Sequence, residues 1–534
     1  MAAGVVEQAP EWMQGAGSLL ALVFASIAVV VARRTYGIES ERDRVDAERR
    51  EKQDLFERRS QAARISAWWG ENADGEPGVF VRNASEAPVY QLYATILPVD
   101  GTGEGAKIQH MVVPPAPDPI FLRISAGPAE RRRAVRRVMV TFTDASGVRW
   151  QRNQYGRLQE LQPHVTVVAD GVRSEALSNF KDDFRDTYGV GVSFVTEGRT
   201  LTLDRITDEL AAIPDADAAV YPHDWIGELI ERNSIAPILL TDDHRAAFPA
   251  WTLEALTVDG RLYGIPTTID TTALLRNTDL VPDAPSSLDE LLEIGLALRA
   301  EGRVREPLAL RVGADGEPFQ MWPLFAGAGG RLFDTTADGW DTSRVRLATA
   351  ESVAALECLR ELGEAGMGVL RRSVGKAEAL ELFVSGRAPF LVTTADALKP
   401  IRAAQVPVAV SAVPGLDGAR AEPAFTAVHG LMLARHGRSR VTALDLFADY
   451  LAHDDVMDAL CRHVVAPVGT HRVPDDPAVA DYARLCARGR PMPSFPQMRQ
   501  TWAALARMEV AVVVGGDPEA AAVAAARDIE RLYR

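Results

Sequence analysis

Cysteine is scarce in this chain of 534 residues, and its three copies lie far apart. Cys358, Cys461 and Cys486 form no Cys-x-x-Cys pair and are too few for a disulfide framework. Basic side chains are also outnumbered, with 58 lysines and arginines against 73 aspartates and glutamates, which gives a net charge of −15. Because phosphate binding needs a basic face, we do not expect nucleic acid as the partner.

Signatures of catalysis and of nucleotide binding are also missing from the sequence. It has no Walker-type phosphate loop, no His-Glu-x-x-His pair and no Gly-x-Ser-x-Gly elbow. The glycine-rich run 327–330 follows a helix-like segment, which favours a turn, and the acidic run 242–244 favours a polar loop over a metal site. The sequence therefore predicts a protein that is no enzyme and needs neither a cofactor nor a metal.

One long apolar run is present, over residues 13–32, and it contains no charged side chain. At roughly 1.5 Å of rise per residue, a helix of that length crosses a bilayer. The short segment 1–12 has no basic residue, so it does not suit a signal peptide, and we predict an uncleaved single-pass anchor in the cell membrane. Arginines cluster directly after the run, between residues 33 and 52, and this flanking charge favours a cytoplasmic position for the rest of the chain.

Two segments separate the predicted anchor from the bulk of the chain. Residues 37–70 predict a charged stalk helix with Asp46/Arg50 and Glu48/Lys52 at i,i+4 spacing, and a short coiled-coil dimer is the alternative. Residues 78–161 change to short alternating strands between Gly, Pro and Asp turns. Such spacing predicts a small antiparallel β-sandwich.

From residue 163 to the end, strands alternate with helices of ten or more residues, which is typical of an α/β fold with a mainly parallel sheet. We expect a hairpin at Asp259-Gly260 and a final helix that begins at Pro518 with Asp517 as its N-cap. Further helices are expected over residues 175–188, 288–300, 352–365 and 376–385.

Carboxylates and aromatic rings recur where these strands and helices end. Carboxylates accept hydrogen bonds from neighbouring hydroxyl groups, and aromatic rings stack on the apolar C–H face of a sugar ring. The set therefore predicts a carbohydrate or similar polyol held in a cleft; it comprises Tyr221, Asp224, Asp270, Glu317, Phe319, Trp322 and Trp502.

Several motifs in this region occur in an order that matches a known family. They are DAAVYPHDW, DGRLYGIP, LLRNTDL, EPFQMWPLFAGAGGRLF, KAEALELFVSGRAPFLV and PMPSFPQMRQTW. With them the chain resembles family 1 of the extracellular solute-binding proteins of ABC importers, and in particular the maltose/maltodextrin-binding type. The resemblance implies a two-lobed periplasmic-binding-protein type II fold whose hinge segments lie near residues 269–273 and 416–426. Lobe 1 would hold about 163–268 and 424–478, and lobe 2 about 273–415 and 482–534.

The same resemblance implies roles for individual residues. Asp224 and Glu317 match positions that hydrogen-bond sugar hydroxyls, and Asp270 stands where the family has a glutamate with that role. Tyr221, Phe319 and Trp502 stand at aromatic positions of the family's pocket.

Other positions depart from the family's pattern. Trp225 replaces a sugar-binding arginine, Asp396 replaces a stacking tryptophan, and Arg173 lies beside an Asp-Lys pair that is not matched in register. A two-lobed binding protein is therefore implied more firmly than a maltodextrin ligand.

The leading hypothesis is a membrane-anchored solute-binding protein that captures a carbohydrate for an ABC permease. The family favours an extracytoplasmic location and the flanking charge a cytoplasmic one, so a membrane-tethered, cytoplasmic-facing ligand sensor or scaffold is the alternative. A third hypothesis, a glycosidase, would need two of these carboxyl groups to face one another across the scissile bond.

Overall fold

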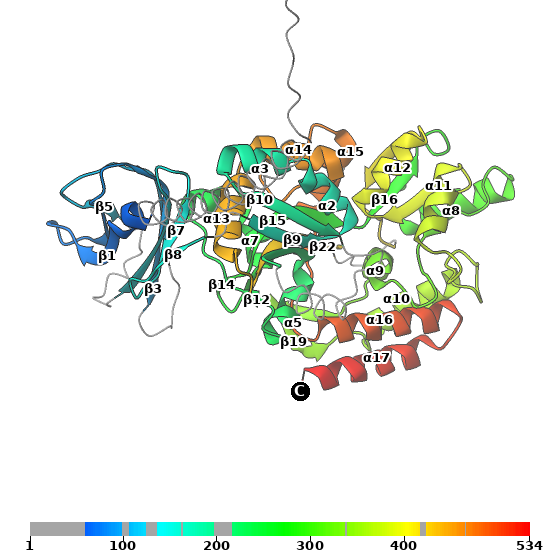
Figure 1. Ribbon diagram of the computed structural model, residues 1–534. Helices are drawn as coiled ribbons and strands as arrows, with labels where there is room; N and C mark the ends of the chain where they lie inside the picture. The colour runs from blue at the N-terminus through cyan, green and yellow to red at the C-terminus, as the bar shows by residue number, and fades with distance from the viewer. Residues whose placement is uncertain are drawn as a thin grey trace, which may run out of the picture.

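The computed structural model describes residues 59–98, 106–123, 136–161, 164–196, 216–336, 339–416, 423–464 and 466–533. A β-sandwich and two α/β lobes follow one another across Figure 1. Within the described residues, no helix has both the length and the apolar character needed to cross a membrane. Residues 1–12, the predicted span 13–32 and the predicted stalk up to residue 58 lie outside the described part.

The β-sandwich consists of two antiparallel sheets that enclose a small core. One sheet has three strands in the order β1-β2-β5, and the other has five in the order β4-β3-β6-β7-β8. Alternate residues of facing strands, such as Val79, Val81 and Leu92, fill the space between them. The strands are β1 (Ile65–Glu71), β2 (Pro77–Asn83), β3 (Val89–Pro98), β4 (Ala106–Val113), β5 (Ile120–Arg123), β6 (Arg136–Thr143), β7 (Arg149–Arg152) and β8 (Leu158–Glu160).

The first of these strands corrects one prediction. We expected a helix up to residue 70, but helical structure ends at Ala63 and β1 begins at Ile65. Ile65, Ala67 and Trp69 face the sandwich core, and Trp68 lies opposite Phe80 of β2 on the outer face. This alternation has the two-residue period of a strand, and aromatic and β-branched residues favour it. The charged pattern of the preceding residues concealed the change of period.

Lobe 1 is built on a mixed sheet in the order β10-β9-β11-β22-β12, with β15 and β23 also paired to β22. The strands β10, β9 and β11 are parallel, but β22 runs antiparallel to β11, β12 and β15. The predicted mainly parallel sheet is therefore wrong, because β22, which returns from the other lobe, runs against β11, β12 and β15. The strands are β9 (His164–Ala169), β10 (Gly191–Thr196), β11 (Ala218–Pro222), β12 (Ile235–Ala236), β15 (Gly264–Thr271), β22 (Phe425–Ala434) and β23 (Arg490–Pro491).

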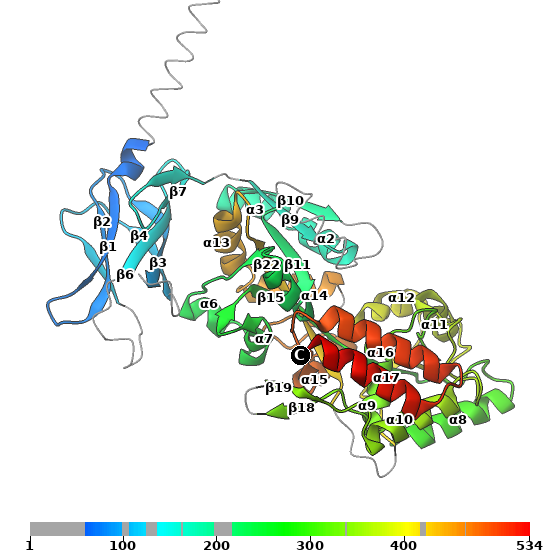
Figure 2. The ribbon, with the colours of Figure 1, turned by 90° about the horizontal axis from the view of Figure 1, so that it is seen from below.

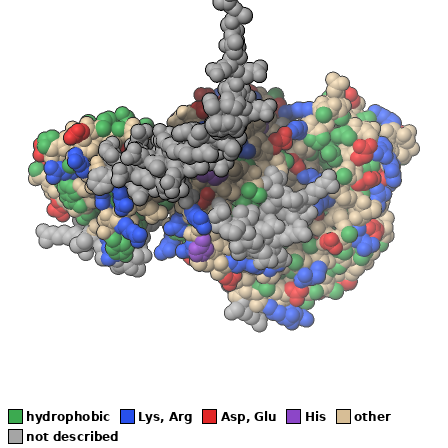
Figure 3. All heavy atoms as spheres, in the orientation of Figure 1, with side chains coloured by type: hydrophobic (Ala, Val, Ile, Leu, Met, Phe, Trp, Pro, Cys, Tyr) green, Lys and Arg blue, Asp and Glu red, His purple; other side chains and the backbone are tan. Residues whose placement is uncertain are grey.

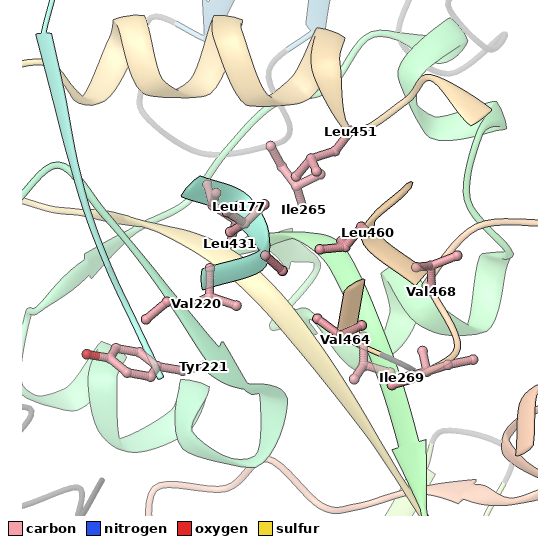
Figure 4. Close-up of a cluster of buried hydrophobic side chains, with 14 of the residues drawn as sticks. Leu177, Val220, Tyr221, Ile265, Ile269, Leu431, Leu451, Leu460, Val464 and Val468 are labelled. Atoms are coloured by element: carbon pink, nitrogen blue, oxygen red, sulfur yellow. The ribbon is translucent and has the colours of Figure 1, made fainter. Parts of the chain in front are cut away.

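Helices cover both faces of this sheet and bury its apolar side chains (Figures 1 and 4). Leu177, Val220, Ile265 and Leu431 meet there from four elements. The helices of this lobe and of its junction with lobe 2 are α2 (Gly171–Ser178), α3 (Lys181–Tyr188), α5 (Ile226–Glu231), α6 (Asp242–Ala246), α7 (Ala250–Ala255), α13 (Arg440–Tyr450), α14 (Asp454–Val464) and α15 (Pro477–Arg488).

Lobe 2 has a smaller sheet in the order β17-β20-β16-β21, packed among helices. Its strands are β16 (Ala273–Asn277), β17 (Ala309–Leu310), β20 (Phe390–Thr393) and β21 (Val408–Ser411), and β18 (Phe333–Thr336) pairs with β19 (Gly339–Val345) in a separate hairpin. Its helices are α8 (Leu288–Ala300), α9 (Pro318–Gly327), α10 (Ala350–Leu362), α11 (Lys376–Val384), α12 (Leu398–Ala403), α16 (Met498–Val513) and α17 (Pro518–Leu532).

Local sequence signals explain several of these boundaries. Asp259 and Gly260 both have positive φ, at 50° and 70°, and form the predicted turn between β13 (Thr257–Val258) and β14 (Arg261–Leu262). Asp517 caps α17 by accepting a hydrogen bond from the backbone N–H of Ala520 at 2.7 Å. The single helix expected over residues 175–188 is wrong in one respect. The chain forms two helices there, α2 and α3, with a break between them.

The β-sandwich is fixed to lobe 1 by a buried carboxylate. Asp445 of α13 accepts hydrogen bonds from Lys107 at 2.7 Å, from Thr141 at 3.0 Å and from Arg149 at 2.8 Å. The Asp445 side chain is 1% exposed, and those of Lys107 and Arg149 are 4% and 5% exposed. Beside it, the ring of Tyr93 lies 6.4 Å from that of His244 in α6. The two views of the molecule agree that the sandwich lies against lobe 1 and away from lobe 2 (Figures 1 and 2).

Replacing Asp445 with alanine should loosen this contact strongly. Two buried cations would lose their common partner, and breaking a buried ion pair from one side costs about 3–5 kcal/mol. We expect a lower thermal unfolding midpoint for Asp445→Ala in the full-length protein, measured by circular dichroism in detergent. Asp528→Ala is the control, because Asp528 forms an exposed pair with Arg507. Equal midpoints for the two variants would contradict the structural role of Asp445.

Candidate functional site

The predicted site residues come from both lobes and from the strand that joins them. Lobe 1 supplies Arg173 in α2, Tyr221 in β11, Asp224 and Trp225 in the short 3-10 helix His223–Trp225, and Asp270 in β15. Lobe 2 supplies the remaining five, which are Glu317 at the start of α9, Phe319 and Trp322 within it, Asp396 in the 3-10 helix Ala395–Ala397, and Trp502 in α16.

Arg173 is held in place on lobe 1 by its neighbours. Asp170 caps α2, accepting the backbone N–H groups of Val172 and Arg173 at 3.0 Å each, and its carboxylate also pairs with the Arg173 guanidinium. The Nε of Arg173 donates to Oγ1 of Thr268 at 3.0 Å, two residues before Asp270 on β15. Burial raises the pKa of Asp170, but the charge of Arg173 and the hydrogen bonds from it together hold that pKa below its usual range.

Asp270 lies where the two lobes meet. Its Oδ1 accepts the backbone N–H of Thr271 at 2.9 Å and, from lobe 2, the backbone N–H of Ala395 at 3.4 Å. Burial raises the pKa of Asp270 to about 7, and the charge of Asp396 adds to the rise, while Arg173 opposes it. Asp396 pairs with Lys376 and accepts a hydrogen bond from the Thr394 hydroxyl at 2.5 Å. Arg173, Asp270 and Asp396 therefore form one charged group across the junction.

Glu317 extends this charged group along lobe 2. Its carboxylate pairs with Arg311 at 2.6 Å, and its backbone N–H donates to Oε2 of Glu509 at 2.9 Å. Burial raises the pKa of Glu317, although the charges of Arg311 and Lys376 oppose the rise. Burial also raises the pKa of Glu509 to about 8, so this second carboxyl group is favoured in its neutral form at pH 7.

A second contact between the lobes joins Asp224 to Trp502. The Trp502 Nε1 donates to Oδ2 of Asp224 at 3.0 Å, and Asp224 is 7% exposed. Burial raises the pKa of Asp224 to about 6, against the stabilising hydrogen bond from Trp502. Its other oxygen, Oδ1, is buried and accepts no hydrogen bond from any described residue. The site therefore has an acceptor that a ligand hydroxyl group could use.

Close backbone packing continues this contact beside Asp224. A side chain at Gly227 would place its Cβ 2.3 Å from the carbonyl oxygen of Ser494, so only glycine lets α5 approach this segment so closely. Next to it, Nε of Arg499 in α16 lies 3.3 Å from the carboxylate of Glu228. In this conformation the lobes touch at Asp224, Gly227 and Glu228.

Three of the predicted aromatic residues lie mainly in the interior. Tyr221 is fully buried (Figure 4). Its ring centroid lies 5.3 Å from that of Trp225, which is itself half-buried. Trp322 is 5% exposed and stacks on Phe425 with ring centroids 4.1 Å apart. Phe319 is half-buried against the core of lobe 2. Tyr221 and Trp322 therefore offer almost no ring face to a ligand in this conformation.

The structure adds neighbours that sequence reasoning did not single out. A cavity of about 160 Å³ beside Asp396 is lined by Gln320, Lys376 and Arg311 among others. Gln320 lies one helical turn after Glu317 and hence on the same face of α9. This spacing was the one feature of the sequence that could have pointed to Gln320. A larger hollow of about 1040 Å³ is lined by Trp251 of lobe 1 and by Trp340 and Arg490 among others, with the Arg490 guanidinium 5.2 Å from the Trp340 ring.

Metal chemistry has no evident place in the described part of the chain. Its residues include no group of three or more His, Cys, Asp and Glu side chains that could hold a metal ion. The site is thus a junction of two lobes rich in carboxylates, with raised carboxyl pKa values and at least one unused buried acceptor.

The sequence match agrees with this two-lobed arrangement. Residues 179–485, more than half of the chain, match the family described as bacterial extracellular solute-binding protein. The chain belongs to this family.

The matches with individual relatives are long but low in sequence identity. The galactooligosaccharide-binding protein of Bacillus subtilis is 20% identical over 368 residues, which cover 63% of this chain and 82% of that protein. The maltodextrin-binding protein MdxE of the same organism is 21% identical over 347 residues, with the same two shares. A maltooligosaccharide ABC transporter solute-binding lipoprotein of Streptococcus pneumoniae is 20% identical over 361 residues, covering 63% of this chain and 81% of its own. These relatives are solute-binding proteins and not enzymes, in line with the predicted absence of catalysis at family level.

Replacing Glu509 with glutamine should change how stability depends on pH. The folded-state pKa of Glu509 is raised, so between about pH 5 and about pH 8 the folded protein binds more protons there than the unfolded chain. This residue therefore makes the protein less stable as the pH rises through that window. Glu509→Gln cannot ionise, so we expect its unfolding midpoint to exceed that of the wild type most clearly near pH 8.

Thermal unfolding followed across that pH range provides the measurement. Asp528→Asn serves as the control, since its exposed carboxylate should leave the pH profile unchanged. If Glu509→Gln has the wild-type pH profile, the Glu509 carboxyl group is not perturbed as described.

Proposed function

We propose that this chain captures a carbohydrate or similar polyol between its two lobes, as the binding component of an ABC-type importer. The observation that carries the proposal is the meeting of predicted polar residues from both lobes at one junction, where Asp270 accepts the N–H of Ala395 and Asp224 accepts that of Trp502. Family membership supports the same role, and the relatives named above bind galactooligosaccharides, maltodextrins and maltooligosaccharides.

The chemistry of the junction favours a neutral ligand with many hydroxyl groups. Carboxylates accept hydrogen bonds from such groups, and Oδ1 of Asp224 is a buried acceptor ready for one. An anionic ligand would face Asp224, Asp270, Asp396 and Glu317. Acidic and basic side chains are interspersed over the face of lobe 2 in Figure 3, which does not suit a polyanionic partner.

Ligand capture would proceed by a hinge motion of the lobes. The chain passes between them where β15 leads into β16 and again before β22. The direct contacts of Asp224 with Trp502 and of Glu228 with Arg499 would open to admit the ligand. A ligand that replaces them with its own hydrogen bonds to both lobes would stabilise the closed form.

Membrane attachment completes the proposal. The uncharged run 13–32 would hold the protein at the cell membrane as a single-pass anchor, and a permease in the same membrane would receive the ligand. The alternative, a membrane-tethered, cytoplasmic-facing ligand sensor or scaffold, keeps the same fold but has the opposite topology and a different role.

Asp224→Asn should weaken sugar binding by the full-length protein in detergent. The amide keeps the shape of the side chain but replaces a carboxylate acceptor, and a hydrogen bond to a charged group is worth about 1.5–3 kcal/mol, so we expect roughly tenfold or greater loss of affinity. Thermal shift with maltose, maltotriose and galactooligosaccharides identifies the ligand, and isothermal titration measures the affinity. Asp528→Asn should bind as the wild type does. A folded protein that no oligosaccharide or polyol stabilises would contradict the proposed function.

Deleting residues 13–32 should release the protein from the membrane fraction, whereas deleting residues 1–12 should not. A reporter fused after Arg534 then decides the topology. Activity of a reporter that works only outside the cytoplasm agrees with the importer role. Activity of a cytoplasmic reporter alone would replace that role with the sensor alternative.

A further inference from the structure

The cavity of about 160 Å³ in lobe 2 adjoins the junction of the lobes. Asp396 lines it and directly follows Ala395, whose backbone N–H donates to Asp270 of lobe 1. A cavity of this size can enclose a group as large as a six-membered ring. One part of its wall is polar, with Gln320, Lys376 and Arg311, and the other part is apolar, with Ala379, Leu380, Leu391, Val392, Ala397 and Pro400.

Gln320 lines this cavity, and its amide oxygen lacks a hydrogen-bond donor within the described part of the chain. The side chain is 8% exposed, and its Oε1 is buried without a hydrogen bond from any described residue. A buried amide oxygen without a donor costs free energy, so a ligand that brings an N–H or O–H group to it gains affinity. Gln320 follows Glu317 by one turn of α9, which places it next to a predicted ligand contact.

The cations of the cavity are already neutralised. Lys376 pairs with Asp396, and Arg311 pairs with Glu317 at 2.6 Å. An anionic group entering here would therefore meet two carboxylates together with the two cations. A lysine has three N–H donors and an arginine five, so both can still donate to an uncharged carbonyl oxygen.

A suitable group thus carries an N–H donor, a carbonyl acceptor and a small apolar end, and has no charge. We propose that this cavity is a subsite for the acetamido group of an N-acetylated amino sugar in the ligand. The N–H donates to Gln320, the carbonyl oxygen accepts from Lys376 or Arg311, and the methyl group contacts the apolar wall. A hydroxyl group could satisfy Gln320 but would leave that wall empty. This inference rests on the proposed function, because it assumes that a sugar lies at the junction.

Three disaccharides of one linkage test the inference without any mutation. Cellobiose carries hydroxyl groups, chitobiose free amino groups and N,N′-diacetylchitobiose acetamido groups at the same ring position. We expect the full-length protein in detergent to bind N,N′-diacetylchitobiose at least about tenfold more tightly than either of the others, as measured by isothermal titration.

Gln320→Leu connects the preference to this cavity. The variant keeps a side chain of similar size but lacks the amide, so it should lose the preference for the acetylated sugar. Gln159→Leu, an exposed position on β8, is the matched control and should change neither affinity. Circular dichroism checks that each variant is folded.

The possible results separate this inference from the proposed function. If cellobiose or chitobiose binds the wild type as tightly as the acetylated sugar, the subsite is refuted while carbohydrate binding stands. If Gln320→Leu is folded and keeps the preference, the acetamido group binds elsewhere and the inference is again wrong. If no sugar of any kind binds the folded wild type, the proposed function fails and the subsite fails with it.

Discussion

The antiparallel pairing of β15 with β22 is the constraint on which the two-lobed architecture depends. The chain leaves lobe 1 at the end of β15 and returns to it at the start of β22. The two points lie at the same end of the sheet, where Asp270 is opposite Ala427 and Thr271 is opposite Thr426. The Thr271 hydroxyl also donates to the Phe425 carbonyl at 2.8 Å. Because the two strands are joined by this ladder, the connections between the lobes lie side by side. Asp270 thus lies at the connection that sets the relative position of the lobes.

Phe425, at the start of β22, ties the aromatic residues of lobe 2 to this pair of strands. It stacks on Trp322 and meets Trp340 and Trp502 edge-on, at 5.9 and 5.8 Å. Trp502 in turn donates to Asp224. The aromatic cluster therefore positions one hydrogen-bond donor of the site and stabilises the junction.

Sequence reasoning reached those parts of the fold that local chemistry determines. The hairpin at Asp259-Gly260 follows from the left-handed conformation those residues tolerate, and the start of α17 follows from the cap at Asp517. It failed for strands whose formation or direction depends on partners distant in the sequence. β1 is a strand because β2 and the sandwich core are available to Ile65 and Trp69, and β22 reverses the sheet because the chain returns from lobe 2.

The same distinction applies to the site. Motif positions predicted the carboxylates, and Asp224 and Asp270 do lie at the junction of the lobes. The burial of Tyr221 and Trp322 was not predictable, because tyrosine and tryptophan are also the residue types whose rings stack on a ligand. Gln320 carries no motif, and only the structure shows that it lines one cavity together with residues of α11 and β20.

The buried carboxylate of Asp445 affects how any change of shape is distributed over the molecule. Lys107 and Arg149 cannot leave Asp445 without stranding charge in the interior, so the β-sandwich and lobe 1 behave as one rigid body. Motion about the hinge strands then displaces lobe 2 relative to that larger body. The β-sandwich lies on the same side of the hinge as lobe 1, so the orientation of the lobe-1 wall relative to the sandwich remains constant while the opposite wall approaches it.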